Sequence, residues 1–87
     1  MFSAVTVKDL KVQVGNWCKL LRKESGLSQM QLAEKLAVSR LTVVKLEKGE
    51  NVTIDTLFKA LQYFQELESL QVFINKRKER FEYESMY

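Results

Sequence analysis

A short stretch after Ser39 combines a guanidinium, two ammonium groups, a hydroxyl and aliphatic groups on one predicted helix face. If Ser39 caps a helix that ends at Gly49, Val43 and Leu46 point inward and the other residues point outward. The outward residues are Arg40, Leu41, Thr42, Val44, Lys45 and Lys48. Glu47 is the only acidic residue of the segment. Such a face is suited to the major groove of duplex DNA.

A second short helix is predicted directly before this one. The Ser28 hydroxyl can cap its first turn, and Gln31, three residues later, completes a capping-box pattern. Its inward face consists of apolar residues at helical spacing, Leu32, Ala33 and Leu36. Ala37 and Val38 then form a tight turn. The pattern therefore predicts two helices joined by a turn, which together position the outward face.

A longer helix is predicted near the amino terminus, where Thr6 and Asp9 form another capping-box pattern. Apolar residues follow at spacings of three and four, namely Leu10, Val14, Trp17, Cys18 and Leu21. We expect Trp17 at the core or its edge and Cys18 as a small buried residue. Gly15 interrupts the helix at a cost of roughly 1 kcal/mol relative to alanine. The sequence therefore predicts a short leading turn and then a helix over about 12–24.

A further helix is predicted after Gly49, capped by Thr53 and with Asp55 near its positive end. Ile54 is expected to make its first contact with the core. The expected inner face is Leu57, Phe58, Leu61 and Phe64. This helix closes the core against the two short helices.

The last third of the chain allows two interpretations. The alternation and β-branched residues of 70–74 favour a short strand that pairs with its copy in a second subunit. The rival interpretation is a helix that pairs with another helix. Both make the same apolar residues the dimer contact, namely Leu67, Leu70, Val72, Phe73 and Ile74.

The predicted domain organisation is a DNA-binding domain at 1–66 and a dimerisation segment with a charged tail at 67–87. The tail is basic first and acidic afterwards, which is typical of a solvated extension. Alternatively, its basic part at 76–80 touches DNA phosphate or a partner. Its aromatic residues can fold back on a second subunit or dock another protein; they are Phe81, Tyr83 and Tyr87.

Composition narrows the possible functions. A chain of 87 residues makes one domain near the lower size limit of independent stability, so dimerisation would help it to fold. Proline is absent, which favours helices, and the net charge of +3 permits nucleic-acid binding. One cysteine and no histidine exclude an internal disulfide, a Cys/His zinc site and histidine acid–base catalysis. We therefore predict no enzyme activity, catalytic residue, metal or cofactor.

The sequence shows neither a membrane-spanning run nor a signal peptide. We accordingly expect a cytoplasmic, nucleoid-associated protein with no membrane partner. A separate ligand-binding domain is not visible, so no small-molecule ligand is expected.

The segment LRKESGLSQMQLAEKLAVSRLTVVKLEKG resembles the helix-turn-helix of the lambda-repressor/Cro/Xre family. The matching marks are Leu21-Arg22, Gly26-Leu27-Ser28-Gln29, Leu32-Ala33, Val38-Ser39, Val43 and Leu46-Glu47-x-Gly49. The resemblance covers about 14–64. The sequence departs from the family pattern at Ala37, where glycine is usual, and at Leu41, where a polar residue is commoner.

This resemblance implies an all-α, lambda-repressor-like bundle of four to five helices, to which the short carboxy-terminal strand would be added. It also implies a partly buried ion pair between Arg22 and Glu47, which join the first and third helices. The alternative for these two residues is a pair of exposed surface charges. The implied function is sequence-specific binding of double-stranded DNA, with the second helix of the motif in the major groove.

The resemblance also implies roles for the residues that would read the bases. Arg40 would be the first base reader, because its guanidinium can contact guanine O6 and N7 together. Thr42 and Lys45 would be further readers or phosphate contacts at the groove edge. Leu41 and Val44 would contact thymine methyl groups.

Other matched positions would hold the DNA backbone. Gln29 resembles the phosphate clamp of the family, with helix amides beside it. Ser39, Lys48 and Asn51 would be further phosphate contacts. A dimer would recognise two half-sites about one helical turn apart in an inverted repeat.

Three functions fit these observations, and the first is a dimeric transcriptional repressor. The second is an antitoxin that binds a cognate toxin and represses the operon of both, because 51–54 and 57–62 also resemble HipB-like antitoxins that pair with HipA-like kinases. The third is an interaction module whose helix-turn-helix no longer binds DNA, although the basic outward face argues against it.

Overall fold

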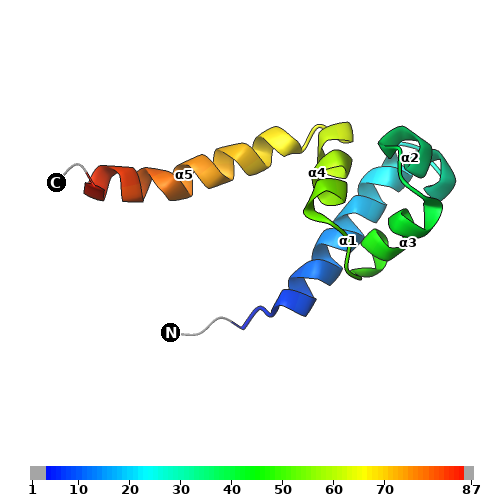
Figure 1. Cartoon of the computed structure of the whole chain (residues 1–87), viewed down its shortest axis with the longest axis horizontal. Helices are drawn as coiled ribbons and strands as arrows, with labels where there is room; N and C mark the ends of the chain where they lie inside the picture. Colours follow the sequence, from blue (N-terminus) through cyan, green and yellow to red (C-terminus); the bar gives the residue numbers. More distant parts are fainter. Residues whose placement is uncertain (1–3, 86–87) are drawn as a thin grey trace.

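The computed structural model describes residues 4–85 and folds them into five helices without a strand, which confirms the all-α prediction. The helices are α1 (Val7–Glu24), α2 (Gln29–Leu36), α3 (Arg40–Lys48), α4 (Ile54–Tyr63) and α5 (Leu67–Ser85). Helices α1 to α4 form a bundle, and α5 extends beyond it as an arm (Figure 1). The molecule accordingly measures 51 × 26 × 21 Å. None of the described helices is long and apolar enough to cross a membrane.

Helix α1 is continuous from Val7, so the predicted leading turn and late start were wrong. Thr6 and Asp9 form the expected capping box at its start. Gly15 does not interrupt the helix, because it is buried where α1 meets α3. A Cβ atom at Gly15 would lie 2.5 Å from the carbonyl oxygen of Leu46. The missing side chain thus permits a close helix contact, which offsets the low helix propensity of glycine.

Helices α2 and α3 form as predicted. The Ser28 hydroxyl accepts a hydrogen bond from the Gln31 backbone N–H at 3.0 Å, and the Gln31 side chain accepts one from Ser28. Ala37 ends α2 in the left-handed conformation, with φ 56° and ψ 44°. Ser39 caps α3, and Gly49 ends it with φ 76°. Ala37 therefore occupies a backbone conformation for which glycine is better suited.

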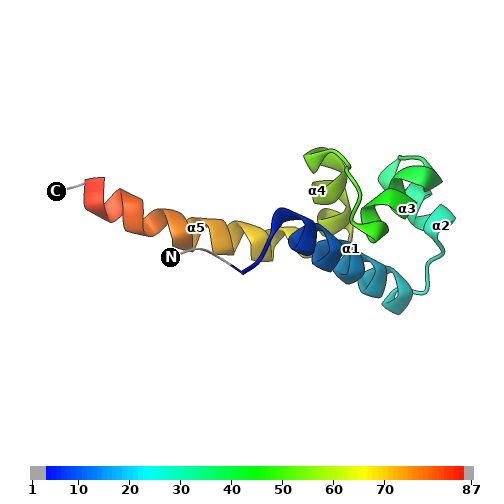
Figure 2. The same ribbon diagram turned by 90° about the horizontal axis from the view of Figure 1, so that it is seen from below.

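The buried core lies between α1, α2, α3 and α4. Figure 2 shows these four helices grouped together, apart from α5. Its hydrophobic members are Cys18, Leu32, Ala33, Leu36, Val43, Leu46, Ala60 and Leu61. The predicted inward faces of α2 and α3 are therefore confirmed. Ala60 was not predicted as a core residue, although it is fully buried.

Three hydrophobic residues are more exposed than the sequence suggested. Ile54, expected to make the first core contact of α4, is 67% exposed. Leu10, on the predicted apolar stripe of α1, is 52% exposed, because the core begins one turn later at Val14. Trp17 is 39% exposed, outside the buried set. The apolar surface of the bundle thus extends past its core.

Helix α5 replaces the short strand predicted at 70–74, and that prediction was wrong. After the C-cap of α4 at Phe64, Gln65 adopts a left-handed conformation with φ 61°, and the Glu66 N–H donates to the Leu61 carbonyl at 2.7 Å. A helix satisfies its backbone hydrogen bonds within one segment, whereas a lone strand leaves them unpaired. Residues 1–3 and 86–87 lie outside the described residues. They include Tyr87 and the outer ends of the two predicted domains. The side chain of Tyr83 is also not described.

Candidate nucleic-acid interface

The outward face of α3 is basic and open. Arg40, Lys45 and Lys48 are exposed, and Leu41 is 60% exposed between them. The remaining two predicted contacts on this face, Thr42 and Val44, are half-buried. The helix therefore presents cationic donors along its length with apolar groups between them, which suits phosphate and base-edge contacts.

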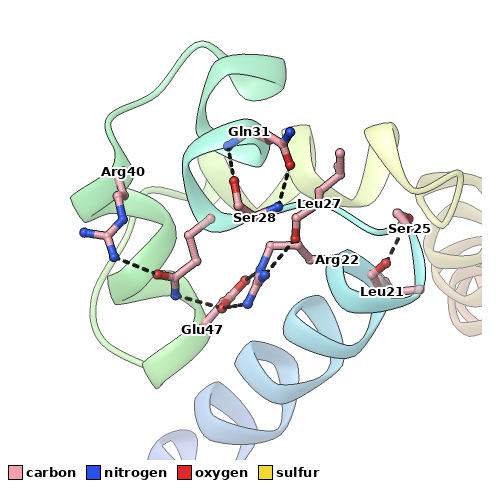
Figure 3. Close-up of polar contacts among 9 residues, drawn as sticks. Leu21, Arg22, Ser25, Leu27, Ser28, Gln31, Arg40 and Glu47 are labelled. Atoms are coloured by element: carbon pink, nitrogen blue, oxygen red, sulfur yellow. Dashed lines mark hydrogen bonds and ion pairs between the residues drawn. The ribbon is translucent and has the colours of Figure 1, made fainter.

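The one acidic residue of α3 points inward and is paired. Glu47 is buried, and its Oε2 lies 2.6 Å from Nε of Arg22 on α1. A second bond joins Nη2 of Arg22 to Oε1 of Glu47 at 3.0 Å, and Nη1 donates to the Leu27 carbonyl at 2.8 Å (Figure 3). The expected ion pair therefore forms, and it removes the only negative charge of α3 from the outward face.

Gln29 connects this ion pair to the outward face. Its Nε2 donates to Oε1 of Glu47 at 3.1 Å, and its Oε1 accepts from Nη2 of Arg40 at 3.4 Å. Four side chains from three helices thus form one hydrogen-bonded chain from Arg22 to Arg40. The sequence predicted Gln29 and Arg40 as separate DNA contacts. No local pattern signals their connection, because the partners lie far apart in the sequence.

Ser39, Thr42 and Asn51 have partners within the protein. The Ser39 hydroxyl accepts from the Thr42 backbone N–H at 3.1 Å, and the two hydroxyls share a bond of 2.9 Å. The side-chain oxygen of Asn51 accepts a hydrogen bond from the Lys11 ammonium of α1. Lys11 was not predicted as a site residue. The contact places an additional cation beside Asn51, near the end of the basic helix.

The predicted dimerisation residues all lie on α5, but not on one face. Leu67, Leu70 and Ile74 line a shallow hollow together with Phe58 of α4. Phe73 is 60% exposed. Val72 is 50% exposed and lies outside this hollow. Helical spacing therefore separates residues that the strand interpretation had grouped in one short segment.

Comparisons with known proteins identify the fold family. A family model described as helix-turn-helix (HTH_3) matches residues 19–69, which is more than half of the chain. The sequence is 37% identical over 51 residues to the antitoxin HipB of Escherichia coli strain K12, covering 58% of each chain. It is 35% identical over 51 residues to the antitoxin HipB of Escherichia coli O6:H1, covering 58% of this chain and 54% of that protein.

A further match is 57% identical over 28 residues to an uncharacterized HTH-type transcriptional regulator of Methanothermobacter thermautotrophicus. That match covers 32% of this chain and 41% of that protein. The chain spans little more than half the length of the HipB relatives that it matches. The segment that matches the family model, residues 19–69, includes the capped helix pair, the buried ion pair and the basic face of α3. The chain belongs to the Xre/Cro-type helix-turn-helix family, a DNA-binding family of transcription regulation.

Proposed function

We propose that this protein binds double-stranded DNA sequence-specifically and represses transcription as a dimer. The observation that carries the proposal is the distribution of charged side chains on α3. Its three cationic side chains are exposed, while its only carboxylate is buried and neutralised by Arg22. A helix of this kind approaches a polyanion without electrostatic repulsion, and its side chains meet the base edges.

The residues of α3 have distinct roles in this proposal. Arg40 reads a guanine, with Thr42 and Lys45 as further readers or groove-edge phosphate contacts. Leu41 and Val44 contact thymine methyl groups. The hydrogen bond between Arg40 and Gln29 supports the first role, because it restricts the long arginine side chain before DNA arrives.

Phosphate contacts complete the interface. Gln29 stands at the first residue of α2, where the backbone N–H groups lack partners inside the helix. Ser39 caps the start of the reading helix, and Lys48 is its last residue. Asn51 follows the helix, with the Lys11 ammonium nearby. These contacts set the register of α3 on the duplex, and the base contacts supply the specificity.

The proposed dimer forms through the exposed apolar side chains of α5. Large hydrophobic side chains are exposed on this arm, among them Val72, Phe73, Ile74 and Phe81. Two copies related by a twofold axis would present two α3 helices to successive major grooves, about 34 Å apart. The matching DNA site is an inverted repeat.

An antitoxin is the second candidate function. Two relatives bear the name antitoxin, and the exposed apolar surface of the arm supports contact with another protein. In this case the DNA-binding face would repress the operon of the toxin and its antitoxin. Co-purification of a cognate toxin from the native host would favour this candidate.

The test is selection of bound sequences from random duplex DNA, with the mass of the complex measured in parallel. The expected result is enrichment of an inverted repeat that is bound by two chains. Absence of enrichment at low salt, with folded protein, would refute sequence-specific binding. It would favour an interaction module that has lost DNA recognition.

A further inference from the structure

An apolar groove lies between the amino-terminal half of α1 and the start of α4. Its apolar lining includes Val7, Leu10, Val14, Val52, Ile54 and Leu57, and its volume is about 340 Å³. We name it the α1–α4 groove. Three of these side chains, Val7, Leu10 and Ile54, are more than half exposed. The groove contains no residue of α5 and none of the proposed DNA contacts.

Helix α5 carries an apolar stripe that its own bundle covers only at one end. Leu67, Leu70, Ile74 and Phe81 are spaced by three, four and seven residues, which places them on one helix face. The first three lie beside Phe58 of α4, whereas Phe81 is 59% exposed on the outer part of the arm. Because α5 is a continuous helix, Phe81 lies about 21 Å along its axis from Leu67. The arm extends away from the bundle in both views, so its outer half does not cover the groove of its own chain (Figures 1 and 2).

We infer that the α1–α4 groove receives the outer half of α5 from a second copy of this chain. Phe81 of the arm inserts between Leu10 and Ile54, and Arg80 pairs with Glu50 at the groove edge. The exchange is reciprocal, so each copy supplies one arm and one groove, as a twofold contact requires. The inference rests on the dimer of the proposed function and specifies what its arms bind.

Charge and size support this occupant. Glu50 lines the groove and is exposed, and neither of the two ion pairs among the described residues involves it. The Arg80 guanidinium carbon lies 4.9 Å from the ring centroid of Phe81, so the cation and the ring approach a partner together. A phenylalanine buries about 150–250 Å² in a well-packed contact. Lys11 also lines the groove, but its ammonium donates a hydrogen bond to the side-chain oxygen of Asn51. The arm therefore supplies an apolar group for the groove and a cation for the Glu50 carboxylate.

A second copy also covers both exposed surfaces at once. The core holds only eight buried hydrophobic residues among those described, and a chain of this size gains stability when it associates. A different protein that filled the groove would leave the arm exposed, and one that bound the arm would leave the groove exposed. Two copies of this chain cover each surface with the other.

Two single-cysteine variants test the contact directly. Leu10→Cys is produced with a large tag and Phe81→Cys without one, and the two proteins are mixed, equilibrated and oxidised with diamide. We expect a disulfide-linked species that contains one chain of each kind. Leu20→Cys is the matched control, because Leu20 lies on α1, is 65% exposed and does not line the groove. The native Cys18 is fully buried and does not compete.

The outcomes separate this inference from the dimer itself. If the protein has the mass of two chains but Leu10→Cys gives no more cross-linked species than the Leu20→Cys control, the inference would be overturned and an α5-to-α5 dimer would remain. A one-chain mass would overturn both the inference and the proposed dimer. A disulfide within one chain of a Leu10→Cys/Phe81→Cys double variant would show that the arm folds onto its own groove. This result would also contradict the exchange.

A charge reversal tests the pair at the groove edge. Glu50→Lys should weaken dimerisation about two- to fivefold, and adding Arg80→Glu to the same chain should restore it. Glu24→Lys, at the far end of α1, changes the net charge equally and should leave dimerisation unchanged. A double variant no tighter than Glu50→Lys would rule out the pair between Glu50 and Arg80.

Discussion

Arg22 and Glu47 lie 25 residues apart in the chain and form a two-point ion pair, with N–O distances of 2.6 and 3.0 Å. Both residues are more than 90% buried. The pair joins the first helix of the bundle to the helix proposed to read DNA. It therefore links the stability of the bundle to the orientation of the reading face.

Replacement of Glu47 by glutamine should destabilise the protein by about 3 kcal/mol, because the Arg22 guanidinium remains buried without a counter-charge. Urea unfolding monitored by circular dichroism measures this change. Glu34→Gln, at an exposed position on α2, is the control and should unfold like the wild type. The double variant Arg22→Met/Glu47→Leu should be more stable than Glu47→Gln, because it removes both charges. A Glu47→Gln protein that melts like the wild type would refute this role.

Gly15→Ala should destabilise the protein by about 1–3 kcal/mol, although alanine is the better helix former. The added Cβ would lie 2.5 and 2.8 Å from the carbonyl oxygens of Leu46 and Glu47, so α1 and α3 must separate. The same unfolding measurement applies. Asn16→Ala, at the next and exposed position of α1, should instead raise stability by a few tenths of a kcal/mol. Equal stability of the two variants would contradict the tight helix contact.

Ala37→Gly should stabilise the protein by about 0.5–1 kcal/mol. The left-handed conformation is strained for alanine by about 1–2 kcal/mol, and the greater freedom of glycine in the unfolded chain offsets part of this gain. Thermal unfolding would report a higher midpoint. Gln13→Gly, at an exposed position inside α1, is the control and should destabilise by about 0.5–1 kcal/mol. A loss of stability at both positions would contradict strain at Ala37.

Arg40→Ala should weaken binding to the selected DNA site by about 1–3 kcal/mol and relax the sequence preference at one base pair. Titration of the variant against sites mutated one position at a time measures both effects. Lys35→Ala, on the neighbouring helix, removes the same charge outside the proposed interface and should keep the sequence preference. An equal loss of affinity for specific and random DNA would show that Arg40 contacts phosphate instead.

Stability should fall between about pH 9 and pH 11 because of Cys18. Burial raises the pKa of its thiol from 9.0 to about 11, and the nearby Glu47 carboxylate adds to this shift. Below pH 9 the Cys18 thiol is protonated in both the folded and the unfolded chain, so its contribution to the free energy of unfolding is complete. As the pH rises to 11 the unfolded chain gains a thiolate that the fold disfavours, which removes roughly 2–3 kcal/mol. Cys18→Ala should lack this part of the slope, and parallel pH profiles of the two proteins would contradict the prediction.

The local parts of the fold were predictable because their signals are local. Ser28, Gln31 and Ser39 mark helix starts through hydrogen bonds that span three residues. The inward faces of α2 and α3 follow from helical spacing. The ion pair was predictable only from the resemblance to the lambda-repressor/Cro/Xre family, because nothing in the local sequence joins Arg22 to Glu47.

The missed features depend on contacts with distant parts of the chain. Gly15 was interpreted as a helix breaker because the residues around it in the sequence do not indicate that the backbone of α3 packs against it. The β-branched residues of 70–74 favoured a strand, but no described segment pairs with them, and the helix meets its own hydrogen-bonding needs. The link between Gln29 and Arg40 likewise required the positions of α2 and α3.

The contact of α3 with α1 has a consequence for the kinetics of recognition. The carbonyl groups of Leu46 and Glu47 rest against Gly15, and Gly49 lies against the backbone of Val12. Helix α3, which is proposed to read DNA, is thus held along its last turn before any ligand arrives. Association with DNA should then require no folding step, so the association rate is set by diffusion and by electrostatic steering toward the basic face. Salt concentration would change the rate of association, while the conformation of the bundle stays the same.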